Sequence, residues 1–305
     1  KKGNKLMKTD KKFQSEDYIN LKNKKYRLFS FSELSTVNEC SMQYYYQYIE
    51  KIKGRDNVYS FMGNIIHEFI ENFYDKSISK EDMLKQYKTE FNNCQYSFDK
   101  ESIKENYFSS IIDYIERLKP LDNVKFEQEK LVYFPLDTFK PELENFAFHG
   151  FIDLLIHHKD NSVSIIDYKT STKYTGKDRI KKSYQLVLYA IALEYLGYRV
   201  KYLAWDFLKT CKIEYKAGTK KHSKTIKRTE IPQYFGFSDI KIYHDMLKIE
   251  LTEELKQEAL NWILTSLDKC KSLRKMEIKD IPFKEGETYF CKSLCSFPFI
   301  CKKNT

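Results

Sequence analysis

Apolar and polar residues fall into short blocks near the middle of the chain. Two apolar runs, residues 152–156 and 163–166, flank a polar stretch at residues 157–162 that contains Lys159-Asp160-Asn161-Ser162. Polar residues of this kind are typical of a turn between paired strands. The pattern therefore predicts a β-hairpin between Gly150 and Thr170.

Apolar residues on both sides of this hairpin recur at spacings of three and four, which predicts helices. Ser30 and Glu33 fit a capping box that opens the first helix, and Pro120 closes the fourth. With the expected strands, the order resembles α-β-β-β-α-β, an α/β fold with a mixed central sheet flanked by helices. The expected helices are 30–52, 61–70, 80–91, 102–118, 178–196 and 251–273, and the expected strands outside the hairpin are 124–134 and 199–208.

The first residues differ in composition from the rest of the chain. Residues 1–28 are polar and rich in lysine, so we expect a basic, flexible N-terminal arm there. Residues 29–305 are expected to form a single domain. The helices within about 76–120 are expected to be an insertion into it.

The 305 residues carry 53 Lys and Arg against 43 Asp and Glu, a net charge of +10. This balance favours an anionic partner, nucleic acid before membrane, although solubility alone would explain it as well. Lys216–Arg228 is dense in cations and is expected to be a hairpin tip or a loop, which either touches phosphates or is simply solvated. No apolar run approaches the roughly 18 residues of a membrane span and no secretory signal is visible, so a cytoplasmic location is expected.

Each strand of the predicted hairpin carries one acid within its apolar pattern. Asp153 follows Phe151-Ile152, and Asp167 stands two residues before Lys169 on the same strand face. A carboxylate in such surroundings is costly unless it is paired or holds a metal. Two carboxylates and an ammonium in one cleft suit metal-assisted phosphodiester hydrolysis. The alternative is that Asp153 is a strand-end turn residue and that Asp167 and Lys169 form a solvated ion pair.

Three successive motifs resemble those of the PD-(D/E)XK nuclease superfamily, and most closely its RecB-type branch. They are Gly150-Phe151-Ile152-Asp153, Asp167-Tyr168-Lys169, and Gln185 with Tyr189 four residues later. Gly63 and His67 match the family's Gly-x-x-x-His motif. The resemblance covers about Phe31 to Cys301 and implies a restriction-endonuclease-like core.

The resemblance also implies roles for individual residues. A Mg²⁺ or Mn²⁺ ion is expected on His67, Asp153, Asp167 and the backbone carbonyl of Tyr168. Lys169 is the expected catalytic lysine. Gln185 would hold this lysine or a phosphate, and Tyr189 would contact the scissile backbone. A supporting glutamate on the strand at 124–134 is either Glu129, the better match, or Glu127.

The chain has seven cysteines, an odd number with no export signal, so a disulfide framework is not expected. Three of them, Cys291, Cys295 and Cys301, lie close together near the C-terminus. The resemblance implies that they bind a 4Fe-4S cluster with Cys40, within a C-terminal iron-sulfur region at 286–305. The spacing between the first two is three residues where the family pattern has two, and Zn²⁺ or unligated thiols are the alternatives.

The resemblance implies a metal-dependent DNA nuclease, expected to be an exonuclease acting on DNA ends or single strands in recombination, repair or phage DNA processing. The chain contains no P-loop motif. It would therefore work alone or with a separate helicase, annealing or recombination protein. The alternatives are a catalytically silent DNA-binding scaffold and a structure-specific endonuclease.

Overall fold

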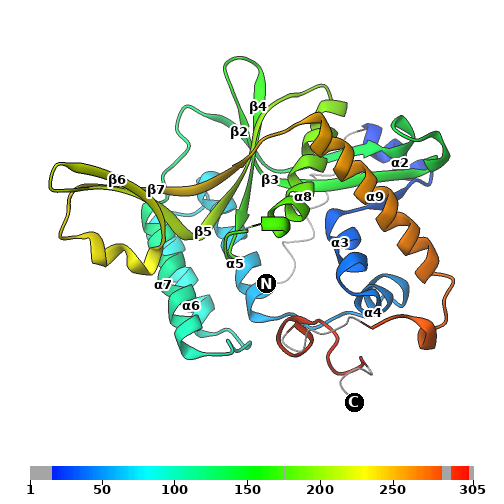
Figure 1. Ribbon diagram of the computed structural model, residues 1–305, viewed down its shortest axis with the longest axis horizontal. Coiled ribbons are helices and arrows are strands. Elements are labelled where there is room, and N and C mark those ends of the chain that lie inside the picture. Colours follow the sequence, from blue (N-terminus) through cyan, green and yellow to red (C-terminus); the bar gives the residue numbers. More distant parts are fainter. Residues whose placement is uncertain (1–15, 175, 284–289, 302–305) are drawn as a thin grey trace.

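A β-hairpin lies at the centre of the computed structural model, which describes residues 16–174, 176–283 and 290–301 (Figure 1). Strands β3 (Phe146–His157) and β4 (Ser162–Lys169) pair antiparallel, with Leu154 opposite Ile166. In the turn, Asp160 Oδ1 accepts hydrogen bonds from the backbone N–H of Ser162 at 3.2 Å and from its hydroxyl at 2.6 Å. The predicted hairpin is confirmed.

The sheet around this hairpin is mixed and, among the described residues, has seven strands in the order β1-β3-β4-β5-β6, with β2 also on β3 and β7 also on β5. The pairs β1–β3 and β4–β5 are parallel and the others are antiparallel. The remaining strands are β1 (Arg27–Phe29), β2 (Lys125–Pro135), β5 (Arg199–Ala217), β6 (Lys220–Lys227) and β7 (Ser238–Ile249). The expected α/β fold with a mixed sheet is therefore confirmed.

Helices cover both faces of this sheet, and Figure 1 shows the two groups on opposite sides. One apolar core contains residues of α3, α8 and α9 together with Trp205 and Ile165 of the sheet. The other contains residues of α5, α6 and α7 with Leu154 and Tyr168. The helices are α2 (Glu16–Asn23), α3 (Phe31–Glu39), α4 (Ser41–Tyr44), α5 (Val58–Tyr74), α6 (Lys80–Asn92), α7 (Glu101–Arg117), α8 (Gly176–Tyr195) and α9 (Glu253–Leu273). No helix in the described ranges is long and apolar enough to cross a membrane.

The expectation of a flexible arm over residues 1–28 is wrong for its second half. Residues 16–23 form α2, and β1 adds residues 27–29 to the sheet. Tyr18 is 1% exposed, and its hydroxyl hydrogen-bonds Nδ1 of His149 at 2.9 Å. Tyr18 and Leu21, three residues apart, share the buried side of α2, a spacing that the surrounding lysines obscured. Residues 1–15 lie outside the described part of the chain.

Two other elements differ from the prediction. The first helix does not run on to residue 52, because Cys40 adopts an extended backbone that ends α3 and begins α4. Residues 216–228 contain a hairpin tip, the first of the two structures expected there: β5 continues to Ala217, Gly218 turns the chain at a φ of +62°, and β6 follows. Strand β7 is a further difference, since the sequence pattern did not predict it.

Candidate active site

Two strands bring the acids of the hairpin together. Asp167 of β4 is 2% exposed, and its Oδ2 lies 2.6 Å from Lys169 Nζ. Asp153 of β3 accepts a 2.8 Å hydrogen bond at Oδ2 from the backbone N–H of Tyr168. The peptide that joins Asp167 to Tyr168 thus directs the Asp153 carboxylate toward the end of β4. The solvated ion pair considered as an alternative does not describe Asp167, which is buried.

Helix α5 adds an imidazole to this cluster. Asn57 caps the helix by accepting from the backbone N–H groups of Tyr59 and Ser60. A Cβ added at Gly63 would lie 3.4 Å from Thr170 Oγ1, which shows that this turn of the helix lies close to the end of β4. One turn later, His67 Nδ1 lies 3.5 Å from Asp153 Oδ2. The Gly63-x-x-x-His67 motif therefore places its histidine beside the hairpin acids.

Burial and mutual charge set the protonation of this cluster. Burial raises the pKa of Asp153 well above its usual range, and the charge of Asp167 raises it further. Burial lowers the pKa of His67, which favours the neutral imidazole that can bind a metal. Burial alone would lower the pKa of Lys169, but the charges of Asp167 and Asp153 raise it overall. An acid pair with only one ammonium is an electrostatic environment that attracts a cation.

Helix α8 supplies the next contacts. Gln185 Oε1 accepts a 3.2 Å hydrogen bond from Lys169 Nζ, and Gln185 Nε2 donates to the Tyr189 hydroxyl at 3.1 Å. Gln185 therefore contacts the lysine, the first of the two roles considered for it. Tyr189 is 5% exposed and lies behind Gln185.

Gly150 belongs to the first of the three motifs, but the sequence did not identify it as a site residue. A Cβ added there would overlap Cε1 of Tyr189. Since a glycine inside a strand pattern often marks a close approach of the backbone, this was the signal available from the sequence. Gly150 leaves room for the ring that supports Gln185.

We expect Gly150→Ala to lower the rate of the phosphodiester hydrolysis expected from the sequence about 10-fold or more and to destabilise the fold by roughly 1–3 kcal/mol, because the added methyl overpacks Tyr189. Gly236→Ala is the matched control, since nothing lies within 4 Å of its added Cβ. Rates and melting temperatures of both variants check the prediction. A Gly150→Ala variant with parental activity would contradict the close fit.

The structure separates the two candidate glutamates. The Glu127 carboxylate pairs with His157 Nε2 and with Lys130 Nζ, each at 2.8 Å, so its partners are these two side chains and not the hairpin acids. Glu129 has a φ of +48°, a left-handed conformation that a non-glycine residue seldom adopts. The ladder between β2 and β3 has no pair at Glu129, although its neighbours Gln128 and Lys130 are paired. The negative charge of Glu129 partly opposes the burial that lowers the pKa of His67.

A second group of candidate residues lies near the start of α5, where Asn57 Nδ2 donates to the backbone carbonyl of Leu294. The thiols of Cys40, Cys291, Cys295 and Cys301 line one cavity together with Tyr46 and Phe297, and none is in a disulfide. Burial raises the pKa of Cys295, and the other three thiols add to the shift. Sequence-distant cysteines are thus brought together as a set. Part of the predicted region at 286–305, residues 286–289 and 302–305, lies outside the described residues.

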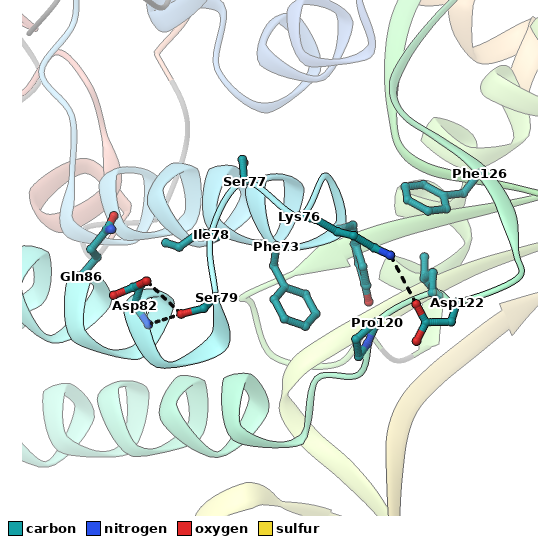
Figure 2. Close-up of a pocket in the computed structure, with 12 residues that line it drawn as sticks. Phe73, Lys76, Ser77, Ile78, Ser79, Asp82, Gln86, Pro120, Asp122 and Phe126 are labelled. Carbon is teal, nitrogen blue, oxygen red and sulfur yellow. Dashed lines mark hydrogen bonds and ion pairs between the residues drawn. The ribbon is translucent and has the colours of Figure 1, made fainter.

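A larger hollow of about 470 Å³ lies between the turn after α5 and the segment after α7 (Figure 2). The charged side chains that line this hollow contact neighbouring protein side chains. Lys76 faces Asp122 at 3.6 Å, and Asp82 accepts a hydrogen bond from the Ser79 hydroxyl at the start of α6. Phe73 and Phe126 form apolar parts of the wall. The candidate active site is therefore the hairpin cluster and not this hollow.

The chain matches the family model of the PD-(D/E)XK nuclease superfamily over residues 28–302. It belongs to this superfamily, and phosphodiester hydrolysis is the activity that membership implies. A crystal structure from Eubacterium rectale, of a protein provisionally named an exonuclease, is similar with a TM-score of 0.44 and 14% sequence identity, over 87% of this chain and 88% of that one. None of the curated proteins matches the chain.

Proposed function

We propose that this chain is a metal-dependent deoxyribonuclease of the RecB-type branch that digests DNA from ends or along single strands. The main support is the convergence of Asp153, Asp167 and Lys169 at the open end of one hairpin, with His67 beside them. DNA is the substrate that family membership suggests. The net charge of +10 also favours a polyanion.

The donor set fits a hard divalent ion. Asp153, Asp167, the Tyr168 carbonyl and His67 would hold Mg²⁺ or Mn²⁺, and the bound ion would supply an activated water and neutralise charge on the phosphate. Within the three described ranges, no group of at least three His, Cys, Asp and Glu side chains was found that could hold a metal ion. Mg²⁺ does not need such a group, because it commonly takes one or two carboxylates and retains several waters.

The chain's own residues then have distinct tasks. Lys169 carries a positive charge that Asp167 and Gln185 hold in place, and this charge would stabilise the negative charge that develops on the phosphate. The Tyr189 hydroxyl accepts a hydrogen bond from Gln185 and so positions that side chain. Because Tyr189 is buried, we assign it this positioning role and not contact with the scissile strand. Glu129 would support the metal site through its charge.

Hydrolysis of end-labelled linear and circular single-stranded DNA by the parent protein, with Mg²⁺, Mn²⁺ or a chelator, tests this function. We expect metal-dependent loss of linear DNA and survival of circles. Equal cutting of circles would instead identify an endonuclease. Tight binding without any cleavage would identify a silent scaffold.

We also propose that the four cysteines bind a 4Fe-4S cluster. A single Zn²⁺ would need all four sulfurs about 2.3 Å from one point, whereas the four cysteines of a 4Fe-4S cluster bind different iron atoms. The support for the cluster is that four cysteines from distant parts of the sequence line one cavity. It would tie Cys40, before the nuclease core, to the C-terminal segment.

For this cluster we expect Cys295→Ala to lose the bound iron and several degrees of melting temperature. Cys94→Ala removes a thiol that does not line the cavity and is the control. Iron and sulfide analysis with thermal unfolding measures both effects in anaerobically purified protein. An unchanged iron content in Cys295→Ala would refute the assignment.

A further inference from the structure

The outer half of β5, with β6 and β7, forms a three-stranded extension that we call the arm (residues 210–217, 220–227 and 238–245). Figure 1 shows its far end at the edge of the molecule, beyond α7. One face of the arm is closed by the segment Arg228–Tyr234. The buried cluster on this face consists of Cys211, Ile213, Ile226, Ile231 and Tyr234.

The opposite face carries a row of lysines. Residues directly opposite each other in a sheet share a face, and the register pairs Thr210 with Lys227, Lys216 with Lys221, and Glu214 with Lys241. This open face therefore bears five lysines and two acids, the second acid being buried at its base: Lys212, Lys216, Lys221, Lys227, Lys241, Glu214 and Asp245. Over residues 212–228 the sequence has seven Lys or Arg against one Glu.

Three of these lysines are available to a partner. Lys212 pairs with Glu214 at 3.0 Å, and Lys216 pairs with Asp239. Lys221, Lys227 and Lys241 are exposed, and none of them forms an ion pair with a residue in the described part of the chain. Tyr243, 43% exposed, lies on the same face opposite Lys212.

The base of this face contacts the segment that follows β4. Asp245 is 4% exposed and accepts from the hydroxyls of Thr210 and Thr225. It also pairs with Lys173 Nζ at 2.7 Å. Lys173 lies only four residues after Lys169, in the segment that leaves β4. The open face of the arm therefore begins beside the segment that carries the catalytic lysine.

We propose that the open face of the arm is a track for single-stranded DNA that leads to or from the active site. Exposed lysines would contact successive phosphates, and the Tyr243 ring offers a surface on which a base can stack. Eight residues of strand at about 3.3 Å each give the track a length of about 26 Å, enough for several nucleotides. This inference rests on the proposed nuclease function and adds the path of the strand.

The experiment compares two triple variants that remove the same charge. Lys221→Gln/Lys227→Gln/Lys241→Gln neutralises the open face. Lys85→Gln/Lys88→Gln/Lys275→Gln neutralises exposed lysines on α6 and after α9. The affinity for single-stranded DNA of about 30 nucleotides is measured as a function of salt. Hydrolysis is measured on this DNA and on bis(p-nitrophenyl) phosphate, which is too small to reach the arm from the active site.

We expect the arm variant to bind this DNA at least about 10-fold more weakly, and the slope of log K against log salt to fall by about 2, near 0.7 for each lost contact. The rate of the arm variant on the small phosphodiester should equal that of the parent. The control triple should change neither the affinity for this DNA nor the salt slope.

A parental salt slope in the arm variant would overturn the track even if the enzyme is active. Absence of all hydrolysis by the parent would remove the proposed function, whereas the salt slope of binding would still support or overturn the track. Loss of binding to anionic vesicles without loss of DNA binding would assign the face to a membrane surface and overturn the proposal.

Discussion

Asp167→Asn is expected to reduce DNA hydrolysis by a factor on the order of 10³ or more, because it removes one of the two carboxylates available to the metal. The amide keeps the shape of the side chain but not its charge. It therefore also weakens the interaction with Lys169 Nζ, which lies 2.6 Å from Asp167 Oδ2. Metal-dependent cleavage of labelled DNA measures the loss, and Mn²⁺ titration measures the metal affinity.

Asp160→Asn is the matched control for this variant. Asp160 lies in the turn of the same hairpin, where it accepts from Ser162 and pairs with Arg199. The control variant should keep parental activity and lose only a little stability. Circular dichroism must show that both variants are folded. Near-parental cleavage by folded Asp167→Asn would mean that the chemistry takes place elsewhere.

Lys169→Met is expected to lower kcat about 100-fold or more, since the ammonium that stabilises charge on the phosphate is lost. The affinity for Mn²⁺ should stay the same or increase, because Lys169 no longer competes for the Asp167 carboxylate. This combination distinguishes a charge-stabilising residue from a ligand. A ligand would lose metal affinity together with rate.

Two further variants complete this test. Gln185→Leu removes the hydrogen-bond acceptor of Lys169 and should cost about 10-fold in kcat, because the lysine is then less well positioned. Lys201→Met changes an exposed lysine of β5 and should have no effect. A Lys169→Met variant that loses metal affinity in proportion to its rate would contradict the assigned role.

Short-range patterns were enough to predict the centre of this site. The two apolar runs around a polar turn predicted the hairpin of β3 and β4, and strand geometry placed Asp167 and Lys169 on one face. The 3.5 Å approach of His67 to Asp153 could not be derived from spacing, because the two residues come from elements separated by α6 and α7. Only the resemblance to a nuclease family connected them.

The arm could not be predicted from local pattern for a different reason. Its strands have a polar open face and few apolar residues, so they lack the strong alternation that identifies a strand with one face buried in a large core. In β6, Ile226 is the one buried residue among eight. The pairing with β5 makes this lysine-rich segment a strand, and the sequence shows only its charge.

The hydrogen bond from the Tyr168 backbone to Asp153 has a consequence for evolution. The donor is a main-chain amide, which every residue except proline possesses, while the phenol ring of Tyr168 packs against the helices on the other face of the sheet. Selection on catalysis can therefore preserve this contact without preserving the tyrosine. Homologues should exchange this residue freely among large apolar side chains and exclude proline from the position.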